Sequence, residues 1–329
     1  MLKNLLLTIL LSLIFTLISG ILVLPLLRKF KAGQTILNYV AEHREKNGTP
    51  TLGGLFFILP AVVVFYLVFG FSRRSSTVSL SIGLAYLIVG FIDDFIKIKL
   101  RKNEGLKAYQ KIIFQLTIAV FSGVFCYING ITTLYLPFVK KTIEVGYLII
   151  PFSSFIFLAI TNGVNLTDGL DSLASGVSFF YLLFLVLIIY AENFILSSNY
   201  INQEESKGLI LLSSCLMGGI LGFLAFNVPK AKVFMGDTGS LSLGGFLGAI
   251  SIFSSNSLFI PLLGIPFVIS CLSVIIQVLY FKKTKGKRIF LMSPYHHHLQ
   301  MKGYTETQIS YFYSLLTCIM GLTLVIFYL

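Results

Sequence analysis

Five aspartates in three short segments are the residues best suited to chemistry in this sequence: Asp93 and Asp94 in FIDDFIK, Asp168 and Asp171 in NLTDGLD, and Asp237 in FMGDTGS. Each segment lies at the end of an apolar run. A carboxylate at mid-depth in a bilayer costs about 2.5–3.5 kcal/mol, so such groups usually face a cavity and have a function. Neighbouring carboxylates repel one another, and a bound cation relieves that repulsion. Oxygen ligands without cysteine pairs or spaced histidines favour Mg²⁺, whose remaining ligands are water and phosphates.

A simpler interpretation remains open for single members of this set, because an aspartate at a helix end often caps the helix. Lys97 lies one helical turn beyond the acidic pair and projects from the same face, where it could neutralise a phosphate, orient a carboxylate or anchor the helix at the membrane surface. Asn165, Asp168 and Asp171 follow one another three apart, which a helical turn would align.

The segment after the last aspartate predicts a helix start. Thr238 and Ser240 are expected to cap the helix that follows Asp237, and the N-terminus of that helix favours an anion. Three of the four histidines are consecutive in MSPYHHHLQMKG: His296, His297 and His298. Metal binding by a helix needs i, i+4 spacing, so contacts from the imidazoles to phosphate or uracil oxygens fit this segment better than a metal site.

The elements that position these residues are predicted to be membrane-spanning helices. Hydrophobic residues make up 56% of the 329 residues, charged residues 12%, and the mean hydropathy is +0.89, which excludes a soluble globular protein. The formal net charge of +12 does not indicate nucleic-acid binding, because the basic residues lie in short loops between apolar runs. The four cysteines lie inside apolar runs without paired spacing, which argues against disulfides and zinc.

Apolar runs of about 20 residues, the length that crosses a bilayer, predict an all-α polytopic membrane protein with about ten spans. The spans are expected near 4–27, 51–70, 78–98, 110–129, 146–163, 174–190, 207–227, 239–255, 258–281 and 308–328. The loops 28–50, 97–111, 162–173, 228–238 and 282–307 share one side and carry 19 of the 25 Lys and Arg, which makes that side cytoplasmic and puts both termini outside. Residues 1–329 are expected to form a single transmembrane domain with active-site loops in the cytoplasm. Glycine pairs such as Gly218 with Gly222 and Gly244 with Gly248 predict close helix packing.

Five segments resemble, in order, successive motifs of the bacterial phospho-N-acetylmuramoyl-pentapeptide transferases, a branch of the polyprenyl-phosphate N-acetylhexosamine-1-phosphate transferase superfamily. They are GTPTLGGL (48–55), GFIDDFIKI (90–98), TNGVNLTDGLDSLA (161–174), FNVPKAKVFMGDTGSLSLGG (226–245) and MSPYHHHLQMKG (292–303). The resemblance implies Mg²⁺-dependent transfer of phospho-MurNAc-pentapeptide from UDP-MurNAc-pentapeptide to undecaprenyl phosphate, giving lipid I and UMP for peptidoglycan synthesis. It also implies a multi-pass protein of the bacterial plasma membrane, in contact with membrane lipid and often a homodimer.

The resemblance also implies roles for individual residues. Asp93, Asp94 and Asp237 are expected to be catalytic and to bind the metal, with one of the acidic pair acting as base or nucleophile, and His296 is expected to be catalytic. The residues expected to bind substrate are Lys46, Lys97, Lys111, Asn162, Asn165, Asp168, Asp171, Asn227, Phe234, His297 and His298. Among them, Asn227 and Phe234 would form the uridine pocket, and the lysines would meet phosphates.

The sequence departs from the family pattern at Ser172, where the family usually has glycine, and at Tyr109, where a basic residue is common before Lys111. Two other functions stay open at this point. A sister transferase that uses UDP-GlcNAc would share most motifs, although the PxHHH pattern argues against it. An ion-coupled transporter would have its aspartates at mid-bilayer on broken helices. Direct attack by the lipid phosphate and a covalent intermediate on a carboxylate are both compatible with the sequence.

Overall fold

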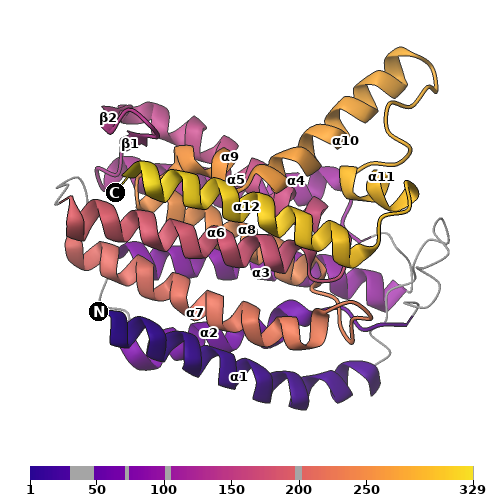
Figure 1. The fold of residues 1–329 in the computed structure, drawn as a ribbon, viewed down its shortest axis with the longest axis horizontal. Coiled ribbons are helices and arrows are strands. Elements are labelled where there is room, and N and C mark those ends of the chain that lie inside the picture. Colours follow the sequence, from indigo (N-terminus) through magenta and orange to yellow (C-terminus); the bar gives the residue numbers. More distant parts are fainter. Residues whose placement is uncertain (30–47, 71–73, 101–104, 197–201, 329) are drawn as a thin grey trace.

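The computed structural model describes residues 1–29, 48–70, 74–100, 105–196 and 202–328. Ten helices of 17 or more residues account for most of this part of the chain: α1 (Leu2–Lys29), α2 (Gly53–Phe69), α3 (Arg74–Leu100), α4 (Ala108–Ile128), α5 (Ile149–Thr167), α6 (Leu173–Tyr190), α7 (Gln203–Asn227), α8 (Gly236–Phe253), α10 (Ile265–Lys283) and α12 (Glu306–Tyr328). Most of them run roughly parallel or antiparallel to one another, whereas α10 leans away from the bundle (Figure 1). The expected polytopic helical membrane fold is confirmed.

Eight of these helices in the described residues are long and apolar enough to cross a membrane, and α2 is a shorter apolar helix. The tenth helix, α8, is rich in glycine and serine, and its residues from Thr238 to Phe253 are all buried. It packs against α2, α3 and α5 at the centre of the bundle. Because its neighbours shield it from lipid, α8 does not need the hydrophobicity of a lipid-facing span.

Small residues allow the helices around α7 and α8 to approach closely, as the glycine spacing predicts. A Cβ added at Gly218 or Gly222 would collide with α1, and one added at Gly244 or Gly248 would meet Thr161 or Phe157 of α5. These glycines bring backbones together where a larger side chain would force the helices apart.

The predicted ninth span, 258–281, is broken in the structure. A 3₁₀ turn η4 (Ser257–Phe259) and a single turn α9 (Ile260–Leu263) precede Gly264, and only then does α10 begin. Proline lies in the first turn of both α9 and α10. Proline lacks the N–H that a continuous helix would need, so the chain restarts at Gly264 and α10 takes a new direction.

One β-hairpin adds to the all-helical expectation. Strands β1 (Thr133–Leu136) and β2 (Lys141–Glu144) pair antiparallel, with Leu136 opposite Lys141. A short 3₁₀ turn η2 (Gly146–Leu148) leads from the hairpin into α5, and a π-helical turn η3 (Ala191–Ile195) extends α6. At the other end of the bundle, the short helix α11 (Tyr295–Met301) connects α10 to α12 (Figure 1).

Candidate active site

The three aspartates predicted to bind a metal meet at one end of the bundle. Asp93 and Asp94, each only 2% exposed, lie near the C-terminal end of α3, and Asp237 lies in the first turn of α8. One oxygen from each carboxylate lies within 4.8 Å of the other two. The N–H of Leu106 donates to Asp93 Oδ1 at 2.8 Å and fixes its orientation. An all-oxygen group of this size fits a hard divalent cation.

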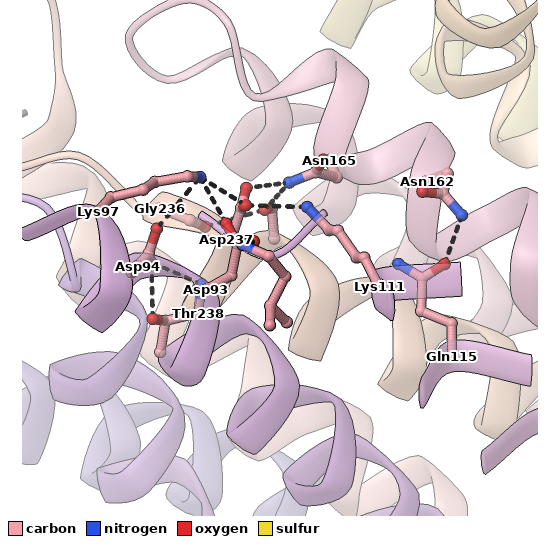
Figure 2. A network of polar contacts seen from close by, with 12 residues as sticks. Asp93, Asp94, Lys97, Lys111, Gln115, Asn162, Asn165, Gly236, Asp237 and Thr238 are labelled. Atoms are coloured by element: carbon pink, nitrogen blue, oxygen red, sulfur yellow. Dashed lines mark hydrogen bonds and ion pairs between the residues drawn. The ribbon is translucent and has the colours of Figure 1, made fainter. Parts of the chain in front are cut away.

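Two lysines from different helices bind this carboxylate cluster (Figure 2). Lys97 Nζ lies 2.6 Å from Asp93 Oδ2, 2.8 Å from Asp237 Oδ2 and 3.8 Å from Asp94 Oδ1. Lys111 Nζ, from the first turn of α4, lies 2.8 Å from Asp237 Oδ2. The prediction that Lys97 shares a face with the acidic pair is therefore confirmed. Three carboxylates face two ammonium groups, so the cluster keeps an excess of negative charge.

Asn165 and Thr238 complete the hydrogen bonds around the cluster. Asn165 Nδ2 donates to Asp237 Oδ1 at 2.5 Å and to Ser240 Oγ at 2.9 Å. The backbone N–H and the hydroxyl of Thr238 both donate to Asp94 Oδ2, at 2.9 and 2.7 Å. The expectation that Thr238 and Ser240 cap α8 is wrong: the helix begins before them, and the Asp94 carboxylate occupies its N-terminal N–H group. Asp94 is itself the anion at this helix end.

The GTPTLGG segment holds the aspartate segment of α8 in place through its backbone. Gly53 N donates to Phe234 O at 2.9 Å, Gly54 N donates to Met235 O at 3.0 Å, and Phe234 N donates to Pro50 O at 2.9 Å. A Cβ on Gly54 would collide with the backbone of Gly239, so glycine is required for this approach. The motif was visible in the sequence, but this role depends on contacts between segments far apart in the chain.

The NLTDGLD segment is helical only in its first half. Helix α5 ends at Thr167, and Asp168 is its C-cap, so Asp171 is not aligned with Asn165 by a helical turn as the spacing predicts. Burial, followed by the charges of Asp237, Asp94 and Asp171, raises the pKa of Asp168 well above its usual value. A cation in the cluster would relieve the cost of ionising Asp168. Asp171 instead accepts a hydrogen bond from Ala231 N at 3.1 Å.

Two of the expected substrate-binding asparagines have their side chains engaged within the protein. Asn227 Oδ1 accepts from Ser172 N at 3.0 Å, and its Nδ2 donates to Val233 O at 2.9 Å. Asn162 Nδ2 donates to Gln115 Oε1 at 2.7 Å. Gln115 is fully buried one helical turn beyond Lys111 and joins α4 to α5 beside the cluster (Figure 2). No motif singled out Gln115, because its role is apparent only where two helices meet.

Of the three consecutive histidines on α11, His296 and His297 both point toward Gly169, with ring centroids 4.3 Å apart, whereas His298 points elsewhere. His296 is fully buried against Gly169, and neither ring nitrogen has a hydrogen-bond partner among the described residues. Burial, and then the neighbouring His297, hold the pKa of His296 well below its usual value. His297 Nδ1 shares a hydrogen bond of 2.7 Å with Gln300 Oε1. His298 Nδ1 accepts from Leu291 N at 3.1 Å, so its contact is with the preceding loop.

Comparison with known proteins identifies the family. The glycosyl transferase family 4 model matches residues 76–255. Curated relatives named phospho-N-acetylmuramoyl-pentapeptide-transferase match almost the whole chain. The relative from Clostridium novyi (strain NT) is 41% identical, over 96% of this chain and 94% of its own length. The relative from Clostridioides difficile (strain 630) is 40% identical, over 95% of this chain and 94% of its own length. That of Desulfitobacterium hafniense (strain DSM 10664 / DCB-2) is 41% identical over 97% and 96%.

The chain belongs to the phospho-N-acetylmuramoyl-pentapeptide-transferase family. It is therefore an integral membrane phospho-sugar transferase of a bacterial family. The family 4 match covers the carboxylate cluster but ends before the histidines. The alignments with the pentapeptide transferases cover nearly the whole of this chain.

Three further expectations from the pentapeptide-transferase resemblance concern single positions. Ser172, at the position of the usual family glycine, has φ 61°, so the turn keeps the left-handed conformation that glycine adopts readily. Phe234, expected to form part of the uridine pocket, is half-buried, and its backbone is hydrogen-bonded to Pro50 and Gly53. Lys46 lies outside the described residues.

Proposed function

We propose that this chain transfers phospho-MurNAc-pentapeptide from UDP-MurNAc-pentapeptide to undecaprenyl phosphate, giving lipid I and UMP in the first membrane step of peptidoglycan synthesis. The observation that carries the proposal is the meeting of Asp93, Asp94 and Asp237 with two lysines at the ends of three helices. Their arrangement suits a pyrophosphate that needs both cationic partners and a metal. The names of relatives about 40% identical over nearly the full length support the choice of substrate.

We assign Mg²⁺ binding to Asp93, Asp94 and Asp237, because the carboxylate oxygens match its preference and their charge exceeds that of the two lysines. When bound, Mg²⁺ supplies positive charge that stabilises the pyrophosphate during transfer.

Two chemical routes fit the same residues. In the first, Asp93 or Asp94 accepts a proton from the lipid phosphate, whose oxygen attacks the sugar-linked phosphorus while the bond to UMP breaks. In the second, one of these carboxylates attacks that phosphorus, UMP leaves, and the lipid phosphate then displaces the carboxylate. A single-turnover reaction with labelled sugar substrate and without lipid acceptor separates the two routes. Stoichiometric release of UMP with transfer of the label to the protein supports the second route. Absence of UMP release supports the first route.

The other site residues divide according to whether their side chains hold a backbone group of another segment. We assign phosphate binding to Lys97, Lys111 and Lys46. We assign contacts with nucleotide or sugar to Asn162, Asn165, Asp168, Phe234, His296 and His297. Asp171, Asn227 and His298 act on the substrate indirectly, because each holds a backbone group of a neighbouring segment.

The decisive experiment is a side-by-side assay of UMP release. Purified protein with Mg²⁺ and undecaprenyl phosphate is supplied with UDP-MurNAc-pentapeptide or with UDP-GlcNAc. Release of UMP only with the muramoyl substrate, and its loss with EDTA, supports the proposal. Release with UDP-GlcNAc alone would assign the chain to the sister activity, and absence of release with either substrate would refute the proposed reaction.

We also propose that the protein resides in the bacterial plasma membrane as a homodimer, with the carboxylate end in the cytoplasm and both termini outside. The Lys and Arg of the loops at that end support this orientation. The homodimer is tested by the molecular mass of the protein in detergent, where a monomer at all protein concentrations would contradict it.

A further inference from the structure

The β-hairpin lies at the end of the bundle opposite the carboxylate cluster, and the proposed reaction gives it no role. Helix α5 begins just after the hairpin and ends at Thr167, next to Asp168, so its 19 residues separate the two sites by about 28 Å. The hairpin is held through β1, where Tyr135 N donates to Ser255 O at 2.9 Å and the Tyr135 ring stacks on Phe259. All four residues of β2 are exposed.

The tip of the hairpin has an unusual composition for a turn. Phe138 and Val139 are 46% and 55% exposed. Phe138 and Lys140 have positive φ, at 68° and 54°. Turns normally place glycine, asparagine or aspartate at such positions, and a bulky residue with positive φ is strained. Exposed apolar side chains in a strained turn indicate that the tip contacts something apolar.

Contacts with α12 place the tip at the edge of the membrane. The Phe138 ring lies 5.3 Å from the ring of Phe327, and Lys140 Nζ lies 5.4 Å from the centre of the same ring. Phe327 is the last residue of the apolar span of α12. The span that follows the hairpin in the chain begins at Gly146, directly after β2. Its Tyr147 is 68% exposed, as are tyrosines in the aromatic belts of membrane interfaces. The hairpin thus lies between the ends of two spans.

Two lysines at the tip supply the charge that an anionic surface would bind. Lys140 and Lys141 are exposed, and neither forms a salt bridge with a described residue. They are two of the six basic residues outside the basic loops of the carboxylate end. The topology bias that accounts for those loops does not account for lysines at this end. Ile143 points to the same side of β2 as Lys141 and is 46% exposed.

We propose that the hairpin tip is a lipid-binding site, in which Phe138, Val139 and Ile143 insert into the leaflet at this end of the protein and Lys140 and Lys141 bind the phosphate of an anionic phospholipid. A bilayer is the occupant that fits an exposed apolar tip beside the ends of two spans. Each lysine is expected to strengthen binding of phosphatidylglycerol about fivefold, the equivalent of about 1 kcal/mol.

The chain contains no tryptophan, so a single introduced tryptophan reports on its own surroundings. Val139→Trp is placed in nanodiscs of phosphatidylcholine with or without phosphatidylglycerol, and Lys302→Trp, at an exposed site beside α11, is the control. We expect the tip tryptophan to emit at shorter wavelength than the control and to be quenched by phosphatidylcholine brominated near the headgroup. Added phosphatidylglycerol should strengthen the quenching, and Lys140→Gln with Lys141→Gln should remove that increase.

Two outcomes would overturn the proposal. Water-like emission without quenching, at both Val139→Trp and Ile143→Trp, would show that the hairpin stands clear of the bilayer. If added phosphatidylglycerol changes the quenching equally with and without Lys140 and Lys141, these lysines do not bind the lipid headgroup. UMP release by Val139→Trp and Ile143→Trp reports that these two variants are folded, because the hairpin lies far from the carboxylate cluster.

Discussion

Asp237 is the residue on which most of the site converges. It accepts hydrogen bonds from Lys97, Lys111 and Asn165, which belong to three different helices. Asp93 and Asp94 each have a separate backbone donor, Leu106 N and Thr238 N, so their orientation is fixed independently. A carboxylate with three polar partners is held in one geometry, which reduces the reorganisation needed when substrate binds.

Replacement of Asp237 by asparagine keeps its size and removes its charge. We expect UMP release to fall about 100-fold or more, because the proposed Mg²⁺ site loses a ligand and both lysines lose their shared partner. The assay is UMP release with saturating Mg²⁺. Glu144→Gln, which makes the same chemical change at an exposed site on β2, should leave the rate unchanged. Equal rates for Asp237→Asn and the parent protein would refute the metal assignment.

His296 makes the folded state sensitive to acid. Its pKa in the folded protein lies well below the unfolded value of about 6.5, so the unfolded chain binds the proton more readily. The stability contributed by neutral His296 is complete above about pH 6.5 and is lost as the pH falls toward the folded pKa, by up to about 1.4 kcal/mol per pH unit.

Thermal unfolding in detergent at a series of pH values tests this prediction. His296→Gln should show a shallower loss of stability on acidification than the parent protein. His297→Gln, the same substitution at the adjacent and less buried ring, should keep more of the parent's slope. Identical slopes for the parent and His296→Gln would mean that His296 is not the group responsible.

At the scale of elements, the turn between α5 and α6 contains a serine in a left-handed backbone conformation that serine does not favour. Ser172 precedes α6 with φ 61° and ψ −1°, a left-handed conformation that costs a non-glycine residue about 1 kcal/mol. Its hydroxyl donates to the carbonyl of Asp171 at 2.6 Å, and its N–H donates to Asn227. The backbone hydrogen bond is independent of the side chain, so the turn is expected to survive a change to glycine.

Ser172→Gly should therefore raise the unfolding midpoint by about 1–3 °C, since it removes the strain at a modest cost in chain entropy. Ser178→Gly, the same substitution inside α6, should lower the midpoint, because glycine disfavours a helix interior by about 1 kcal/mol. Both midpoints are measured by thermal unfolding in the same detergent. A midpoint for Ser172→Gly at or below that of the parent would contradict the assigned strain.

At the scale of the whole molecule, the two ends of the bundle differ. One carries the carboxylate cluster with the α10–α11 loop nearby, and the other carries the β-hairpin (Figure 1). The basic residues of the loops at the cluster end predict that this end faces the cytoplasm. This orientation puts the cluster where a water-soluble nucleotide sugar is made and where the lipid phosphate can reach it from the inner leaflet.

Cysteine labelling in intact cells tests the orientation. In a variant without the four native cysteines, Glu144→Cys on the hairpin should react with a membrane-impermeant maleimide. Lys287→Cys, between α10 and α11, should react only after the cells are permeabilised. The reverse pattern would place the carboxylate cluster outside and exclude the proposed reaction.

The sequence by itself determined the helical membrane fold and singled out the carboxylates that meet at one end of the bundle. Spans were predictable because burial in lipid requires long apolar helices, whatever surrounds them. The aspartates were predictable because charged groups are rare near a bilayer and need a function. The position of Lys97 beside the acidic pair was predictable from helix periodicity, because its spacing from that pair puts it on the same face of one helix.

Only the tertiary structure decided which polar groups meet across helices. Helix spacing could not show that Asp94, rather than Thr238, satisfies the start of α8, or that Gln115 binds Asn162. Nor could it show that α5 ends at Thr167, that α10 restarts after Gly264, or that residues 133–144 form a hairpin. These features depend on contacts between segments far apart in the chain, and a local pattern carries no information about which distant segment will supply the partner.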